Sequence, residues 1–209
     1  MAGKSGIDVS HWNGDIDFQK VKLATVDFVM IKAGGSDKGF YMDSKFNEYY
    51  SGAKKAKLNV GAYYFVGSKF DTTKAGVEDA KRFMNILRGK QFEMPVVLDI
   101  ESTTIKQKDG ATEATIAFCK EMEKNGYYVA IYASDVHGFH ECLNLDKLTE
   151  FDKWVARYNT AGPKWVKDYG MWQFSCSGQV YGIKGTVDMD YSFKDYPKII
   201  KKAKLNGWT

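Results

Sequence analysis

The spacing of apolar residues alternates between two periods along most of the chain. Short runs of β-branched and aliphatic residues predict buried strands, and between them apolar residues recur at the helical spacing of three or four. The predicted strands cover residues 6–10, 28–33, 59–65, 94–101, 128–132, 153–158, 170–175 and 185–190. A short helix is predicted to begin near residue 17, and four further helices are predicted over residues 43–57, 72–89, 111–125 and 195–205.

Strand and helix alternate through the first two-thirds of the chain, whereas the last third has many strands and little room for helices. Alternation predicts a parallel sheet with right-handed crossovers. Eight strands in 209 residues are few residues for a full (β/α)8 barrel, which usually takes about 250. We therefore predict an α/β fold, an irregular TIM-like barrel whose last strands lack helices. One domain over 1–209 is expected, with its core from about 6 to 193 and a closing helix at about 195–205.

The strand at 94–101 ends in two acids, Asp99 and Glu101. Alternate side chains of a strand point the same way, so the two share a face, with Cα atoms roughly 6–7 Å apart. One acid of such a pair keeps its proton because its neighbour is already charged. A protonated acid beside an ionised one is what cleavage of a glycosidic bond requires. The alternatives are a carboxylate pair that binds Mg²⁺ and an acid that caps a helix.

Acidic and aromatic residues recur at the ends of the predicted strands. In a barrel, the carboxyl ends of the strands surround one opening, and that opening carries the chemistry. Aromatic rings suit the apolar faces of sugars, while carboxylates and amides bind hydroxyl groups, so the pattern favours a carbohydrate-active site. The residues at these positions are Asp8, Lys32, Tyr63 or Tyr64, Asp99 with Glu101, Tyr132, Arg157 or Tyr158, Trp172 with Gln173, and Asp188, and Trp12 follows in the first loop.

Composition excludes several other classes of protein. Three widely spaced cysteines argue against both a disulfide framework and a thiolate metal site. His137, His140 and Glu141 lack the H-E-x-x-H spacing of zinc peptidases, and no phosphate or dinucleotide motif is present, so we predict no metal and no cofactor. A net charge of +4 with scattered basic residues does not suggest a nucleic-acid partner.

The sequence also bears on location. No apolar run approaches the roughly 20 residues of a membrane helix, so we expect no membrane insertion. The first five residues lead directly into a predicted strand, without a hydrophobic leader. We therefore expect synthesis in the cytoplasm without a signal peptide.

Seven short blocks, taken together, resemble the glycoside hydrolase family 25 lysozymes. They occur in the family's order, and the resemblance extends from about residue 6 to residue 193. The blocks are residues 6–14, 61–65, 97–101, 130–132, 154–158, 172–174 and 187–190. The chain departs from the family pattern at Tyr64, where His is frequent, and at Asp190, where Asn is frequent, which leaves open whether Asp188 or Asp190 faces the site.

The resemblance implies a barrel of the (β/α)5β3 type. It also implies an N-acetylmuramidase that cleaves the β-1,4 bond between N-acetylmuramic acid and N-acetylglucosamine of bacterial peptidoglycan. Glu101 matches the family's general acid/base, Asp99 its partner that supports the substrate's acetamido group, and Asp8 and Asp188 the other two acids of the site. We expect the substrate-binding residues to be Trp12, Lys32, Tyr63, Tyr64, Tyr132, Trp172 and Gln173.

Muramic acid carries an N-acetyl group that can act as the nucleophile, so we expect substrate-assisted hydrolysis with net retention. Glycan strands of peptidoglycan are the expected partner of a monomeric protein. A phage endolysin that acts on the host cell wall is the expected context, with a secreted autolysin as the alternative. The alternative functions are a glycan-binding module without activity and another barrel glycosidase that acts on N-acetylated sugars.

Overall fold

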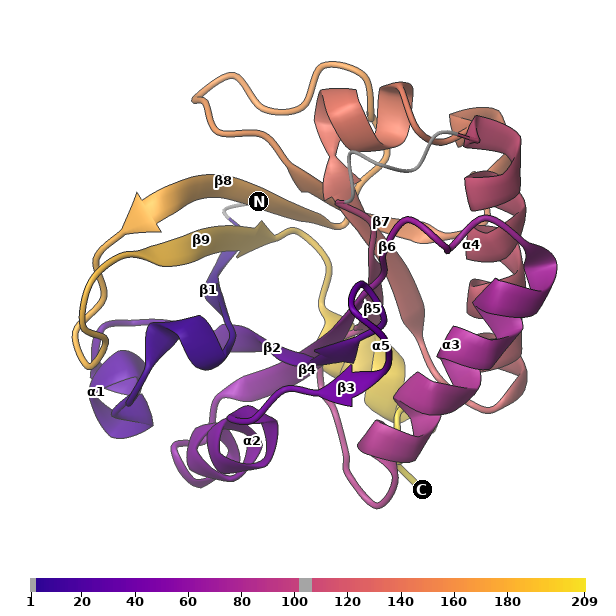
Figure 1. The fold of residues 1–209 in the computed structure, drawn as a ribbon. Helices are drawn as coiled ribbons and strands as arrows, with labels where there is room; N and C mark the ends of the chain where they lie inside the picture. The colour runs from indigo at the N-terminus through magenta and orange to yellow at the C-terminus, as the bar shows by residue number, and fades with distance from the viewer. Residues whose placement is uncertain (1–2, 102–106) are drawn as a thin grey trace.

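The strands close into a barrel in the computed structural model, which describes residues 3–101 and 107–209 (Figure 1). The order is β1-β9-β8-β7-β6-β5-β4-β2, and pairing of β1 with β2 completes the circle, which confirms the predicted TIM-like barrel. A short strand, β3 (Tyr41–Met42), pairs with the end of β2. The barrel strands are β1 (Lys4–Val9), β2 (Phe28–Gly35), β4 (Asn59–Phe65), β5 (Val96–Asp99), β6 (Val129–Ser134), β7 (Asp152–Ala156), β8 (Met171–Gly178) and β9 (Val187–Ser192).

One barrel strand, β9, runs against the others. The other seven barrel strands pair in parallel with one another, whereas β9 is antiparallel to both β8 and β1. An antiparallel neighbour can follow through a short loop, so β9 needs no crossover helix. Because β9 runs in the opposite direction, its first residues lie at the barrel mouth, where the other strands have their last residues. Asp188 lies there, at the start of its strand and not at the predicted end.

Four helices cover the outside of the first strands: α1 (Phe18–Leu23), α2 (Phe46–Lys55), α3 (Thr73–Leu87) and α4 (Lys108–Lys124). Side-chain caps start two of them, because Asp17 accepts from the Gln19 amide and Thr72 from the Ala75 amide. After β6, a single π-helical turn, η2 (Asp135–His140), takes the place of a fifth helix, and short 3₁₀ turns lie at η1 (His11–Asn13) and η3 (Leu145–Lys147). Among the described residues, no helix has the length and apolarity that crossing a membrane requires.

Strand alternation sorts the apolar side chains into two clusters. One lies between the barrel and the helices and includes Val29, Leu98 and Phe118. The other fills the barrel interior with larger rings, among them Phe28 and Trp154. The division follows from the period of two along each strand, and it decides which of two adjacent residues reaches the mouth.

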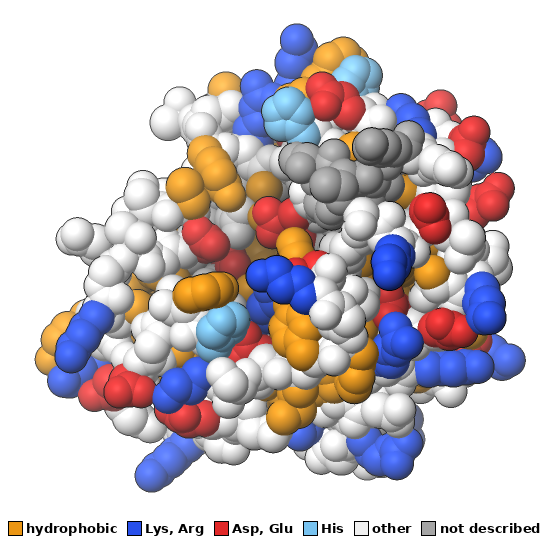
Figure 2. Space-filling model, in the orientation of Figure 1, with side chains coloured by type: hydrophobic (Ala, Val, Ile, Leu, Met, Phe, Trp, Pro, Cys, Tyr) orange, Lys and Arg blue, Asp and Glu red, His pale blue; other side chains and the backbone are white. Residues whose placement is uncertain are grey.

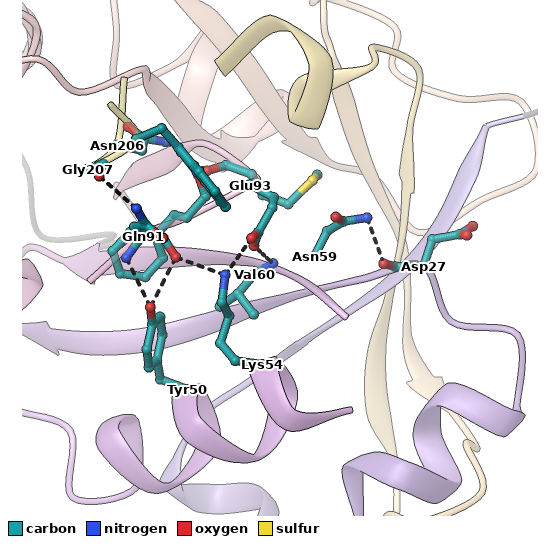
Figure 3. Close-up of polar contacts among 12 residues, drawn as sticks. Asp27, Tyr50, Lys54, Asn59, Val60, Gln91, Glu93, Asn206 and Gly207 are labelled. Carbon is teal, nitrogen blue, oxygen red and sulfur yellow. Dashed lines mark hydrogen bonds and ion pairs between the residues drawn. The ribbon is translucent and has the colours of Figure 1, made fainter. Parts of the chain in front are cut away.

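The chain returns at its end to close the barrel opposite the mouth. After α5 (Tyr196–Lys202), the residue Asn206 adopts a left-handed backbone with φ of 54°. Its side chain accepts from the Tyr128 amide at 2.8 Å and donates to the Met94 carbonyl at 3.0 Å. Gln91 donates to the Gly207 carbonyl at 3.1 Å in the same network (Figure 3). These contacts anchor the tail below the barrel.

Candidate active site

A small polar pocket of about 100 Å³ opens at the mouth of the barrel. Figure 2 shows acidic side chains around the hollow near the centre of this face. The four predicted acids meet in it, although they come from the first strand, the middle and the last strand of the barrel. Its lining residues are Asp8, Tyr63, Asp99, Glu101, Tyr132, Trp154, Tyr158, Gln173 and Asp188.

Asp99 and Glu101 occupy different environments within this pocket. Strand β5 ends at Asp99, whose side chain is buried with one carboxyl oxygen, Oδ1, lacking a hydrogen-bond partner among the described residues. Glu101 lies beyond the strand and is exposed at the mouth. The two carboxyls of the predicted pair therefore differ in their access to a ligand.

Both carboxyls of this pair bind protons more tightly than ordinary acids. Desolvation is the largest cause that raises the pKa of Glu101; Lys32 lowers it and the charge of Asp188 raises it. Burial also raises the pKa of Asp99 well above its usual value, and the neighbouring charge of Glu101 adds to this effect. The sequence-based explanation placed like-charge repulsion first for Glu101. The structure places desolvation first.

Gln173 connects the two sides of the pocket floor. Its Oε1 accepts from the hydroxyl groups of Tyr132 at 2.8 Å and Tyr158 at 2.9 Å. Its Nε2 donates to Oδ2 of Asp8 at 2.7 Å. Because the two hydroxyls can donate to the amide oxygen and the carboxylate can only accept, the network fixes the amide orientation. Gln173 therefore holds Asp8 in place.

Asp188 and Asp190 both point into the barrel, since they are two residues apart on β9. Asp188 lines the pocket. Asp190 is fully buried below it, and its Oδ1 accepts from Nε1 of Trp154 at 2.8 Å. Burial raises the pKa of Asp188 and raises that of Asp190 to about 8. The open choice between these acids is thus answered: Asp188 faces the pocket and Asp190 supports its floor.

Two predicted substrate contacts lie elsewhere. Tyr64 packs between the barrel and the helices, where its hydroxyl donates to Asp79 at 3.2 Å. Trp172 lies outside the barrel and donates from Nε1 to the Arg157 carbonyl at 2.8 Å. Their neighbours Tyr63 and Gln173 line the pocket. Placing Tyr64 and Trp172 at the mouth was wrong, because alternation allows only one residue of each adjacent pair to face inward.

Trp12 and Lys32 lie beside the pocket and not within its lining. Trp12 on η1 is 83% exposed, with its ring 4.5 Å from that of His11. His11 is fixed in turn by Asp43, whose Oδ2 lies 2.7 Å from Nδ1. The Lys32 ammonium lies 4.4 Å from the centre of the Phe65 ring. An exposed indole and a lysine thus flank the acids.

The sequence prediction missed Trp154 as a lining residue and did not choose Tyr158. Trp154 faces the barrel interior, where its ring centre is 4.5 Å from that of Tyr132. Tyr158 follows the end of β7 and reaches Gln173. The inward alternation of residues 154 and 156 was the available signal for the first. The second depends on a loop conformation that alternation does not predict.

The histidines set aside in the sequence make contacts near η2. Nδ1 of His137 lies 2.8 Å from Oε2 of Glu141. The ring of His140 stacks on Trp165 at 3.7 Å. Within residues 3–101 and 107–209, no group of three or more His, Cys, Asp or Glu residues is arranged to hold a metal ion.

Comparison with known proteins shows the family of the chain. The model of "Glycosyl hydrolases family 25" matches residues 7–183. The autolytic lysozyme of Clostridium acetobutylicum is 29% identical over 185 residues, which cover 88% of this chain and 54% of that protein. Lysozyme M1 of Streptomyces globisporus is 28% identical over 201 residues, covering 90% and 67%. The chain thus spans about half of the first relative and two-thirds of the second.

Solved structures agree with this assignment. The bacterial lysozyme from Streptomyces coelicolor superposes with a TM-score of 0.82 at 25% identity, covering 100% of both chains. The CTP1L endolysin has the same TM-score of 0.82 at 28% identity and covers 95% of this chain and 70% of its own. The chain therefore belongs to glycosyl hydrolases family 25, the family of glycoside hydrolases that its sequence resembles.

Proposed function

We propose that this chain cleaves the β-1,4 bond between N-acetylmuramic acid and N-acetylglucosamine and acts on bacterial cell walls. The observation that supports this most is the meeting of Asp8, Asp99, Glu101 and Asp188 in one pocket. No lysine or arginine is among the described residues that line it. The names of the lysozyme relatives support the same substrate class.

Glu101 is the proposed general acid. It is the member of the Asp99–Glu101 pair that is exposed at the mouth, where a glycosidic oxygen can reach it. Its raised pKa favours the protonated form that the first step consumes. Once the leaving sugar has taken the proton, the same carboxylate can activate the water that completes hydrolysis.

Asp99 is the proposed support of the substrate's acetamido group. Its Oδ1 lacks a donor among the described residues, so it is available to accept from the N–H of an acetamido group. That contact would orient the acetamido oxygen toward the anomeric carbon for attack. The intermediate is then opened by water, and the configuration at the anomeric carbon is retained.

The remaining residues suit sugar binding in two ways. Tyr63, Tyr132 and Gln173 present hydroxyl and amide groups inside the pocket. The exposed ring of Trp12 at the rim offers a flat apolar surface for a sugar bound outside the pocket. We propose that the pocket holds the sugar at which the bond breaks and that Trp12 contacts a neighbouring one.

A digest of purified peptidoglycan tests the proposal. Mass spectrometry of the products should show N-acetylmuramic acid at the new reducing ends. Reducing ends of N-acetylglucosamine would indicate a different glycosidase, and binding without release of reducing sugar would indicate a glycan-binding module. Activity that is lost on adding a chelator would favour the metal-dependent alternative.

The stereochemistry needs a separate measurement. Proton NMR of the product, recorded before mutarotation, should show the β-anomer at the new reducing end. Appearance of the α-anomer first would contradict substrate-assisted retention and leave the cleaved bond as established by the digest.

A further inference from the structure

The pocket floor contains two adjoining carboxyls, those of Asp8 and Asp190. They lie on the paired strands β1 and β9, where Asp188 is directly opposite Asp8 and Asp190 follows two residues further along the same face. The carboxyl of Asp8 contacts both of these acids, but only Asp8 and Asp190 are buried, at 6% and 0% exposed, whereas Asp188 is partly exposed. Each has one oxygen held by a neutral donor, Gln173 for Asp8 and Trp154 for Asp190. Oδ2 of Asp190 is buried, and no described residue donates to it. Each of the two acids therefore accepts one hydrogen bond from a neutral side chain.

No cation compensates this pair within the described part of the chain. The other ionisable groups that line the pocket around it are the acids Asp99, Glu101 and Asp188 and three tyrosines, Tyr63 on β4, Tyr132 on β6 and Tyr158 beyond β7. The charge of Asp188 disfavours ionisation of both carboxyls, whereas Lys32 acts on Asp99 and Glu101. Two adjacent buried carboxylates without a cation cannot both be ionised at low cost.

We propose that Asp8 and Asp190 share one proton, which makes Asp190 a positioning residue that holds the carboxyl of Asp8 toward the pocket. Trp154 holds Oδ1 of Asp190, which leaves Oδ2, the oxygen without a donor among the described residues, for the contact with Asp8. Raised pKa values of both groups accord with a retained proton. The role of Asp8 in hydrolysis depends on the proposed function, whereas the shared proton does not.

Thermal melting between pH 4 and pH 9 tests the shared proton. Asp190→Asn replaces the protonated acid by an amide, whose N–H can donate to Asp8 and whose oxygen can accept from Trp154. An unfolded aspartic acid loses its proton near pH 4, and the folded pair retains one to about pH 8. Wild-type stability must therefore decrease relative to Asp190→Asn as pH rises through this range.

The expected result is a difference in melting temperature that widens in favour of Asp190→Asn by at least about 5 °C from pH 5 to pH 9. Asp146→Asn makes the same charge change at an exposed site and should differ from wild type by a constant amount. If the Asp190→Asn profile also runs parallel to wild type, the pair does not hold a proton and the proposal is wrong.

Two further measurements keep the test decisive. Carbon NMR of the aspartate carboxyls in the wild-type protein should show two coupled signals that still titrate above pH 6. Titration of both near pH 4 would overturn the proposal even if Asp190→Asn does not fold.

The positioning role of Asp190 is tested by activity. Asp190→Ala should reduce peptidoglycan turnover at pH 6 more than Asp190→Asn does, and equal losses would contradict the positioning role. Melting as expected without any hydrolysis would overturn the proposed function alone.

Discussion

Two glutamates flank strand β5, Glu93 before it and Glu101 after it, and their surroundings differ. Glu93 is buried at the end of the barrel away from the mouth, where it binds the Lys54 ammonium and accepts from the Val60 amide at 3.1 Å (Figure 3). Glu101 lies at the mouth among other acids, and its pKa is raised. Glutamate is thus part of a structural ion pair at one end of the barrel and the proposed proton donor at the other.

The difference extends to the other buried acids. Away from the mouth, Asp152 accepts from the hydroxyls of Tyr128 and Tyr196 and pairs with Lys194. At the mouth, Asp99 and Asp190 each retain a buried oxygen without a donor among the described residues. An unpaired buried acid costs stability, so its position in a pocket is evidence for chemistry.

Among the substitutions that test this difference between the two ends of the barrel, Glu101→Gln should cause the largest loss of turnover. The amide keeps the shape of the side chain but cannot donate the proton, so turnover should fall by about 10²–10⁴-fold. The melting temperature should stay close to that of wild type, because the side chain is exposed. Release of reducing sugar from purified cell walls measures the first quantity, and near wild-type release would contradict the role of Glu101.

Glu93→Gln should reduce stability and leave turnover unchanged. The amide oxygen can still accept from Val60, but the ion pair with Lys54 is lost, at a cost of about 2 kcal/mol of unfolding free energy for this partly exposed lysine. Turnover at 25 °C should be unchanged. Lys54→Met is the matched control, because it leaves the buried carboxylate unpaired and should cost more. A variant that loses activity without losing stability would remove the distinction between the two ends.

The sequence predicted the barrel because its apolar runs are long and regular. It could not predict which member of an adjacent pair faces inward, since a shift of one residue exchanges the two faces of a strand. Tyr63 and Gln173 were therefore predicted together with their outward neighbours. A bulge in β2 between Lys32 and Gly34 changes the register close to the mouth, and such an irregularity leaves no clear pattern in the sequence.

The candidate acids were predicted from the ends of the predicted strands, and the family resemblance added their individual roles. The contacts that support these acids were not predicted. Asp190 appeared only as an alternative to Asp188, although the two have distinct positions on one face of β9. Its contact with Trp154 joins residues 36 positions apart, and the contact of Gln173 with Asp8 spans 165. Such pairs depend on how the barrel closes, which spacing along the chain does not contain.

Lys32→Met should give the smallest effect and tests the electrostatics of the mouth. The ammonium lowers the pKa of both Glu101 and Asp99, so its removal should raise both. Methionine retains an apolar stem that can pack on Phe65.

The proposed general acid is active when protonated, so activity should be lost as pH rises through the pKa of Glu101. The alkaline limb of kcat/KM should therefore move to higher pH in Lys32→Met, as measured on a short soluble glycan. Lys38→Met, which removes an exposed lysine from the loop after β2, should leave the limb in place. A limb that stays or moves to lower pH would show that Lys32 does not control the proton of Glu101, and the contrast with the Glu93–Lys54 pair would then rest on desolvation alone.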